Sequence, residues 1–563
     1  DGNLQFSTVQ SNRIAGYTPS GRIGIRTGRW TLTASGSGSF TPVAESRFTE
    51  TREQAGQPLP FAGRSDSKSR TNYGRGHFSA VFDPTPKHTA GFDIEYTERS
   101  THMPTLSRTT LGQTQSDSRY RQHMDGNTLT ATANYIWKID TLGSQFKLIA
   151  DYTRYTSDGD NSYHTTTCAP GTLRDSLYES ATGSVYDILT ADAGLTRKLP
   201  HGLTLRAGLR YTRNDMADKS RYAAQTQGTW LALPEYSYDQ HYTEQIGAAY
   251  ASLEYSAGRW ELSAGLRGEY TSVASQAFGR SYFGLFPNVS VSRALNALRT
   301  WLLGAQGSRN IERPAFPALN PARIRISDYS WQSGNPSLRP TYIHRFSLTA
   351  VWKYRYTLTV GGNLHHDLIR EIAHRDATAP DAVYIRPENH YTENHWFVAA
   401  SVPAKITRWW NLSVNAVGVM QRIRLNSTDS PATHYLMFAD ATCSFTLPAG
   451  FFAEAAYRAQ SRLYSGNSEV GPRHTLSATV KKQLFDKRLT LFCTLSNITG
   501  CDWEFASLTD GMRRTIDTRQ AWSGRLWKVG AAWNFRTGKK FRARTVESAA
   551  ETQRKRLVKS TEQ

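Results

Sequence analysis

The stretch HGLTLRAGLRYTRN, residues 201–214, alternates between two kinds of side chain. Apolar residues occupy one parity, from Leu203 to Tyr211, while Thr, Arg and Gly occupy the other, from Thr204 to Thr212. Successive side chains of a strand point to opposite faces, so this stretch predicts a β-strand with one apolar face and one polar, cationic face. In a soluble sandwich the apolar face would meet a protein core. In a membrane barrel it would meet lipid, and the polar face would line a lumen.

The same alternation recurs along the chain, and the lengths of the connections distinguish the two architectures. NTLTATANYIW (127–137) and WELSAGLRGEY (260–270) repeat it over about 10 residues, the length of a tilted strand that crosses a membrane. Tight turns are predicted at 27–29, 83–87, 140–144, 199–202, 256–259, 294–299, 353–355, 406–408, 447–450 and 485–488. Long polar connections are predicted at 49–66, 102–120, 157–179, 217–238 and 314–337. Short turns on one side and long loops on the other are typical of outer-membrane barrels, with the short turns periplasmic and the long loops extracellular.

Ten tight turns joining pairs of strands, with one strand before the first pair and one after the last, predict an all-β, transmembrane, antiparallel β-barrel of about 22 strands. Plugged transporters have about 22 strands, whereas porins have about 16 to 18. A β-propeller is disfavoured because no repeat of blade length is present, and a soluble sandwich remains the other alternative. We expect the barrel to cover residues 1–535 and residues 536–563 to form a basic, flexible periplasmic tail.

The composition agrees with a barrel and excludes a helical membrane protein. Only 39% of the 563 residues are hydrophobic, and no run approaches the roughly 20 apolar residues of a spanning helix. Aromatic residues make up 12% of the chain, which suits rings at the membrane interfaces. The formal charge of +20 is spread over strands, loops and tail, so we expect contact with anionic outer-membrane lipids and no nucleic-acid partner.

No motif in the sequence predicts an enzyme, a cofactor or a metal site. Nucleophile elbows, phosphate loops and paired zinc ligands are absent from the sequence, and the four cysteines show no CxxC spacing. SDGDNS (157–162) lacks the later glutamate of an EF-hand and is interpreted as a solvated loop tip. His365 and His366 are adjacent in a predicted strand and point to opposite faces, so they are poorly placed to bind one ion.

Two groups of side chains are candidates for contact with a solute. Charged residues on the polar parity of the strands are predicted to face the lumen, where they would be solvated and would tune selectivity or pair with a plug. These lumen candidates are Arg206, Arg210, Glu261, Arg267 and Glu269. Aromatic, cationic and imidazole groups in predicted outer connections could stack on or hydrogen-bond a ligand, although packing within the loops is the simpler interpretation. These loop candidates are Arg325, Tyr329, Trp331, His390 and His395.

The segment RNIERPAFPALNPARIRISDYSWQSGNPSLRP (309–340) resembles the β-barrel domain of TonB-dependent outer-membrane receptors, and within that group the barrels of the Bacteroidota, which include SusC-like transporters. LSNITGCDWEF, beginning at Leu495, is similar to a diverged segment of the same barrels. Gly and Asn tolerate unusual backbone angles and Pro fixes φ, so we interpret the motif residues as structural. They are Arg313, Pro314, Asn320, Pro321, Gly334, Asn335, Pro336, Leu338 and Pro340.

The resemblance implies uptake of a large or scarce solute across the outer membrane, gated by an N-terminal plug and powered by a TonB-type energy-coupling protein. Strand-like alternation begins at once in NLQFSTVQ (3–10), so we expect the plug to lie upstream of this chain, with a naturally plugless barrel as the alternative. A surface lipoprotein is a further possible partner. The competing functions are a structural or docking barrel that transports nothing, and an open pore. The sequence carries no readable code for the solute.

Overall fold

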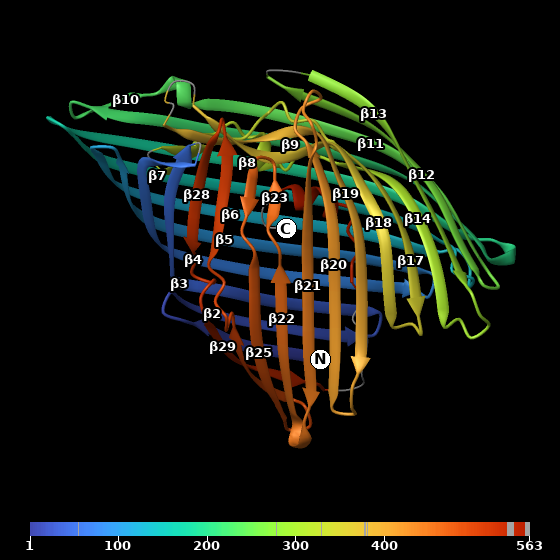
Figure 1. The fold of residues 1–563 in the computed structure, drawn as a ribbon. Helices are drawn as coiled ribbons and strands as arrows, with labels where there is room; N and C mark the ends of the chain where they lie inside the picture. Colours follow the sequence, from blue (N-terminus) through green and yellow to red (C-terminus); the bar gives the residue numbers. More distant parts are fainter. Residues whose placement is uncertain are drawn as a thin grey trace.

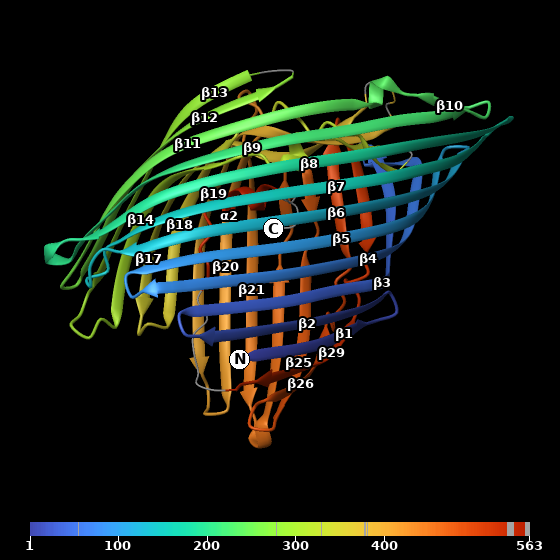
Figure 2. The ribbon, with the colours of Figure 1, turned by 180° about the vertical axis from the view of Figure 1, so that it is seen from behind.

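The structure, a computed structural model, describes residues 1–54, 56–276, 279–327, 329–376, 379, 381–537 and 545–557. Antiparallel strands form a barrel whose wall closes where β1 pairs with β29 along its whole length (Figures 1 and 2). The prediction of 22 wall strands is confirmed. The wall strands are β1 (Gly2–Gln10), β2 (Ile14–Thr27), β3 (Trp30–Gln54), β4 (Gln57–Thr85), β5 (His88–Leu111), β6 (Thr114–Lys138), β7 (Gln145–Ala169), β8 (Thr172–Lys198), β9 (Leu203–Thr226), β11 (Tyr238–Ala257), β12 (Trp260–Ser275), β13 (Gly279–Ala294), β14 (Trp301–Glu312), β17 (Thr341–Trp352), β18 (Tyr356–Arg375), β19 (Val383–Lys405), β20 (Trp410–Arg424), β21 (Ala432–Thr446), β22 (Phe451–Gln460), β25 (Arg473–Leu484), β26 (Leu489–Ser496) and β29 (Leu526–Phe535).

The two faces of β9 have the environments that its alternation predicts. Leu209 is 64% exposed on the outer face, where Leu205 and Tyr211 are exposed as well. Thr204 and Thr212, on the other parity, are buried against the interior. Exposed apolar side chains on the outside of a closed wall are the surface that meets hydrocarbon in a membrane barrel.

All ten predicted tight turns are present at one end of the barrel, but four of the predicted long loops are largely β-structure. Segments 49–66, 102–120 and 157–179 continue the strand pairs β3–β4, β5–β6 and β7–β8 as long hairpins, and segment 217–238 contains the end of β9, which pairs with a short strand at 229–232. Threonine and serine hydroxyls bond across these extensions, as between Ser118 and Thr165 at 2.9 Å. These β-branched and small polar residues fit a pleated sheet without an apolar face, because the extensions stand in water.

The remaining elements are short. Seven strands lie in connections: β10 (Thr229–Ala232), β15 (Ile324–Ser327), β16 (Ser330–Gln332), β23 (Leu463–Ser465), β24 (Ser468–Val470), β27 (Trp503–Thr509) and β28 (Met512–Arg519). The helices are α1 (Phe316–Leu319), α2 (Glu551–Arg554) and the 3-10 turns η1 (Pro200–Gly202), η2 (Pro234–Tyr236), η3 (Pro448–Gly450) and η4 (Lys555–Leu557). No helix in the described part of the chain has the length and apolar character needed to cross a membrane.

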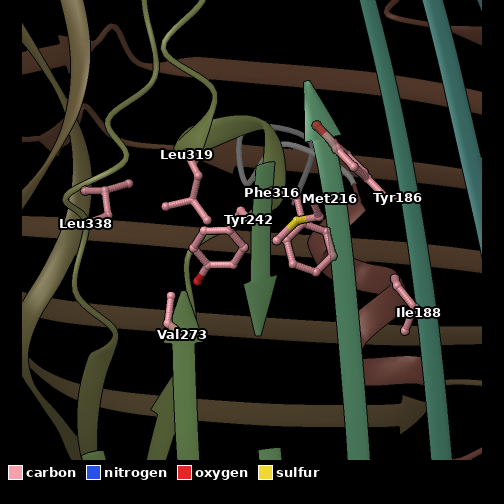
Figure 3. Close-up of a cluster of buried hydrophobic side chains, with 8 residues drawn as sticks. All are labelled: Tyr186, Ile188, Met216, Tyr242, Val273, Phe316, Leu319 and Leu338. Carbon is pink, nitrogen blue, oxygen red and sulfur yellow. The ribbon is translucent and has the colours of Figure 1, made fainter. Parts of the chain in front are cut away.

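The connection between β14 and β17, residues 313–340, folds into the barrel and is called the inner segment below. Phe316 and Leu319 of α1, together with Leu338, pack against apolar side chains of the inner wall (Figure 3). The wall partners are Tyr186, Ile188, Met216, Tyr242 and Val273. This buried cluster holds the inner segment against the inner faces of β8, β9, β11 and β12 rather than leaving it as an open extracellular loop.

Residues 545–557, called the C-terminal segment below, also lie inside the barrel, where Gln553 and Arg556 contact Asn214 and Glu244 on the inner face of the wall. The Ala549 backbone N–H donates to Asp151 Oδ2 at 2.8 Å, and Ala550 is fully buried. The placement differs from the flexible tail that the sequence suggests. Two charged residues of this segment find partners on the wall, because Arg556 bonds the Glu244 carboxylate and Glu547 pairs with Lys147. These partners replace the water that a free tail would keep.

Candidate functional site in the barrel lumen

A cluster of buried charges joins the wall, the inner segment and the C-terminal segment, and is called the Glu244 cluster. It consists of Asn214, Glu244, Glu269, Arg313 and Arg556. Glu244 is 2% exposed. It accepts hydrogen bonds from Arg556 Nη1 at 2.5 Å and from Asn214 Nδ2 at 2.8 Å, and Arg313 Nε lies 3.9 Å from it.

The second carboxylate of the cluster, Glu269, lies between two guanidinium groups. Arg267 Nε donates to Glu269 Oε1 at 2.5 Å, and Arg313 Nη2 donates to Glu269 Oε2 at 2.7 Å. Arg313 also donates to the Thr271 hydroxyl at 2.9 Å. A buried charge is costly unless it is paired and hydrogen-bonded, so each member of this network depends on the others for its low-energy state.

Of the lumen candidates, Arg206 and Arg210 share the parity of the buried Thr212 and Asn214 on β9, and Glu261, Arg267 and Glu269 share the parity of the buried Thr271 on β12. Most of them are engaged in ion pairs between neighbouring strands or along one strand. Arg206 pairs with Glu254 at 3.0 Å, and Arg210 pairs with Asp192 at 2.7 Å. Arg267 and Glu269 pair with each other, and Glu261 accepts a 3.4 Å hydrogen bond from Ser292. Of the five candidates, Glu269 belongs to the Glu244 cluster and Arg267 bonds to it, so the five candidates do not form one site.

The family-motif residues make the bends of the inner segment. The Asn320 carbonyl accepts from the Gly334 N–H at 2.9 Å, and the Ala318 carbonyl accepts from the Asn335 N–H at 2.7 Å. A Cβ at Gly334 would lie 2.1 Å from the Asn320 oxygen, so a side chain has no room there. Leu338 is fully buried in the apolar cluster. The prolines at 314, 321, 336 and 340 occupy the irregular stretches around α1 and before β17.

The loop candidates Arg325 and Trp331 face each other across the β15–β16 hairpin, and Tyr329 lies at its tip. Tyr329 packs edge-on against Phe61, and the Arg325 guanidinium lies 5.6 Å from the Tyr178 ring centroid. The indole N–H of Trp331 is buried and has no hydrogen-bond partner among the described residues. These three residues lie in one hairpin, and their binding role stays a prediction.

His390 and His395 lie in strand β19 and flank Glu393, which is fully buried. His395 Nε2 lies 2.8 Å from Glu393 Oε1, and His390 Nδ1 lies 3.5 Å from Oε2. Arg370 and Gln421 donate to the same carboxylate at 2.9 Å and 2.8 Å. The two histidines thus belong to a buried network around one carboxylate, and Arg325 and Trp331 lie elsewhere.

A hollow of about 690 Å³ lies at the rim, between the extension of β3 and β4 and the connections near β24, β27 and β28. Its walls include Arg47, Arg64 and Trp503, and none of the five loop candidates lines it. Nearby, Glu469 of β24 accepts from Arg513 and from Arg462, the latter at 2.8 Å. Partial burial favours the neutral form of Glu469, but the two guanidinium groups outweigh it and hold its pKa below the ordinary 4.5.

Sequence reasoning missed Asn214, Glu244, Gln553 and Arg556 as members of a site. Arg556 lies in the basic run RKR (554–556), which reads as a solvated tail because its partner is 312 residues away in the chain. The parity of β11 does place Glu244 on the inner face, and that local signal could have added it to the lumen candidates.

Comparison with known proteins agrees with this architecture. The model of a family described as "Outer membrane protein beta-barrel family" matches residues 137–533. The chain belongs to this family. The family places the barrel in the outer membrane of a Gram-negative bacterium. None of the curated proteins compared with the sequence matched it.

Solved structures with a similar fold include three receptors. The siderophore receptor PirA from Pseudomonas aeruginosa has a TM-score of 0.57 at 12% identity, and a mutant of the ferric enterobactin receptor PfeA from the same organism has 0.59 at 13%. The ferric yersiniabactin uptake receptor FyuA from Yersinia pestis has 0.58 at 12%. Each comparison covers 95% of this chain and 80% of the receptor. This family member therefore has the fold of an outer-membrane transporter barrel.

Proposed function

We propose that this barrel takes up a large or scarce solute across the outer membrane, powered by a TonB-type coupling protein through a plug domain. The observation that carries the proposal is the closed wall of 22 strands in the fold of siderophore receptors. A lumen of this strand count is too wide to be filled by wall side chains alone and accommodates a plug. A ferric siderophore is the first solute class to test, because the similar receptors carry that description.

The two alternatives are an open pore and a docking barrel that transports nothing, in which a surface lipoprotein would be the main partner. The inner segment and the C-terminal segment both lie in the lumen, and this favours a gated barrel over an open pore. The docking alternative predicts binding of a partner without uptake of a solute.

A growth experiment separates these functions. Cells that lack the protein are compared with cells that express it, under iron limitation with ferric enterobactin as the only iron source, and each strain is tested with and without depletion of TonB. We expect expression to restore growth and TonB depletion to abolish the gain. Growth that persists after TonB depletion would indicate a passive pore, and no gain with this or other ferric siderophores would remove the proposed solute class.

The hairpin residues Arg325, Tyr329 and Trp331 are the proposed contact for the solute. An aromatic ring and a guanidinium can stack on and hydrogen-bond a planar, oxygen-rich chelate. Trp331→Ala should raise the concentration of solute needed for half-maximal uptake, while Trp522→Ala, which removes an exposed indole elsewhere, should not. Equal uptake by the wild type and Trp331→Ala would exclude this contact.

A further inference from the structure

The C-terminal segment follows the inner wall from the short-turn end of the barrel toward the middle of the lumen. Glu547 pairs with Lys147 at 2.7 Å, close to where β7 begins after its tight turn. Gln553 then accepts from Asn214 of β9 at 3.3 Å, and Arg556 reaches Glu244 of β11. The contacts fall in turn on β7, β9 and β11, so the segment has one defined path.

Arg556, at the far end of this path, holds three structures together. Its Nη1 donates to Glu244 on the wall, and its Nε donates to the Pro314 carbonyl of the inner segment at 3.0 Å. Its guanidinium also lies 4.2 Å from the ring centroid of Phe316. Only 7% of the Arg556 side chain is exposed, and this burial and multiple bonding distinguish it from a solvated tail residue.

The inner segment has other ties to this wall. Arg280 Nη2 donates to the Leu338 carbonyl at 2.6 Å, and the Tyr222 hydroxyl donates to the Arg323 carbonyl. Arg313 bonds Glu269 and Thr271, and the apolar cluster holds Phe316, Leu319 and Leu338. Arg556 thus bonds the backbone of the inner segment next to the apolar cluster, between α1 and the wall. Withdrawal of Arg556 would leave the Pro314 carbonyl and the Phe316 ring without this contact.

We propose that residues 545–557 are an internal latch, which occupies the lumen and holds the inner segment against the wall through Arg556. For the C-terminal segment to leave the wall, two contacts must break together, namely those of Glu244 with Arg556 and of Asp151 with the Ala549 N–H. With the latch released, the inner segment keeps its other contacts, which include the β16–β19 pairing and the bond from Asn335 to the Pro387 carbonyl. The space along the wall that residues 545–557 occupied becomes free for ions from the short-turn end.

Single-channel conductance in planar bilayers tests the latch. The chain of 563 residues is compared with a version that ends at Arg536, with Arg556→Met, and with Lys555→Met as the matched control. Lys555 carries the same charge at the next position but is 62% exposed and pairs only with Glu551. We expect a several-fold rise in mean conductance for the truncation and for Arg556→Met, and none for Lys555→Met.

Equal conductance of the truncated and full chains would overturn the proposal, as would equal effects of Arg556→Met and Lys555→Met. A protease assay on the unaltered protein covers the case in which a variant fails to fold. Trypsin should cut the folded wild type after Arg556 much more slowly than a synthetic peptide of residues 545–557, and faster in Glu244→Gln. Cleavage of the wild type at the rate of the free peptide would also overturn the latch.

Discussion

Arg313 Nη2 lies 2.7 Å from Glu269 Oε2, with both side chains 9% exposed, and this contact ties the start of the inner segment to β12. Arg206 and Glu254 form an ion pair of similar length, 3.0 Å, on the same wall, but their side chains are 51% and 35% exposed. The two pairs therefore differ mainly in their access to water.

Replacing one arginine in each pair should reveal that difference. Arg313→Met leaves two buried carboxylates short of a partner, and we expect a loss of about 3 to 5 kcal/mol in the free energy of unfolding. Arg206→Met, the matched control, should cost about 1 kcal/mol or less, because water replaces the lost partner. Urea unfolding of both variants in detergent gives the comparison, and equal losses would contradict the burial of Arg313.

The close approach of Gly334 to the Asn320 carbonyl predicts that no side chain is tolerated there. Gly334→Ala should destabilise the inner segment by about 1 to 3 kcal/mol, because the backbone must move to admit a Cβ. Gly307→Ala is the control, since a Cβ at that position meets no atom within 4 Å. Hydrogen exchange of residues 313–340 should quicken in the first variant only. Unchanged exchange in Gly334→Ala would show that Gly334 and the Asn320 carbonyl lie further apart.

The outer face of β9 should not tolerate a charged side chain at Leu209. Leu209→Arg places a guanidinium in hydrocarbon and should destabilise the barrel by about 2 to 4 kcal/mol in lipid vesicles. Leu209→Phe keeps the face apolar and should change stability little. If arginine and phenylalanine were tolerated equally, the outer face of β9 would not be lipid-facing.

The ion pairs of Arg206 and Arg210 predict the sign of a selectivity change. Replacing both with Gln leaves Glu254 and Asp192 unpaired on the inner wall, so the lumen should shift toward cations. Arg213→Gln, on the outer parity, removes a charge that pairs with Asp215 and should leave the reversal potential unchanged. Reversal potentials under a salt gradient measure the ion selectivity of the double variant and of Arg213→Gln. A shift toward anions in the double variant would contradict the lumen assignment.

Glu469 should stop stabilising the rim in acid. The pKa of Glu469 is lower in the folded protein than its ordinary 4.5, so its contribution to stability is complete above about that pH and is lost as the pH falls through the folded pKa. The difference in unfolding temperature between the wild type and Glu469→Gln should therefore be constant near neutral pH and shrink in acid. A difference that grows in acid would reverse the sign and contradict the pairing with Arg462 and Arg513.

The sequence was sufficient to predict the barrel because the relevant signal is local. The alternation around Leu205 and Leu209 reports which face meets lipid, and a Gly, Pro or Asp at seven of the ten tight turns reports where the chain reverses. The strand extensions were predicted as loops because polar residues such as Ser118 and Thr165 occupy both faces there, and no alternation is visible. Pairing between two polar strands depends on register, which a single strand does not display.

The lumen contacts were less predictable, because they depend on partners far apart in the chain. Arg313 was recognised through its motif, but its bond to Glu269 follows only from the inward path of residues 313–340. Arg556 has no local feature that separates it from Arg554, which lies two residues earlier and is more exposed. The fold decides which of these two arginines meets Glu244.

The pairing of β1 with β29 joins residues 2–10 to residues 527–535, the two ends of the wall in the sequence. β29 must therefore be synthesised before the cylinder can seal, and until then two rows of backbone amides and carbonyls stay unpaired. Such edges invite aggregation in water and are intolerable in hydrocarbon. The nascent chain consequently needs protection during its transit to the membrane, and a premature stop codon before Leu526 would yield a sheet that cannot be sealed.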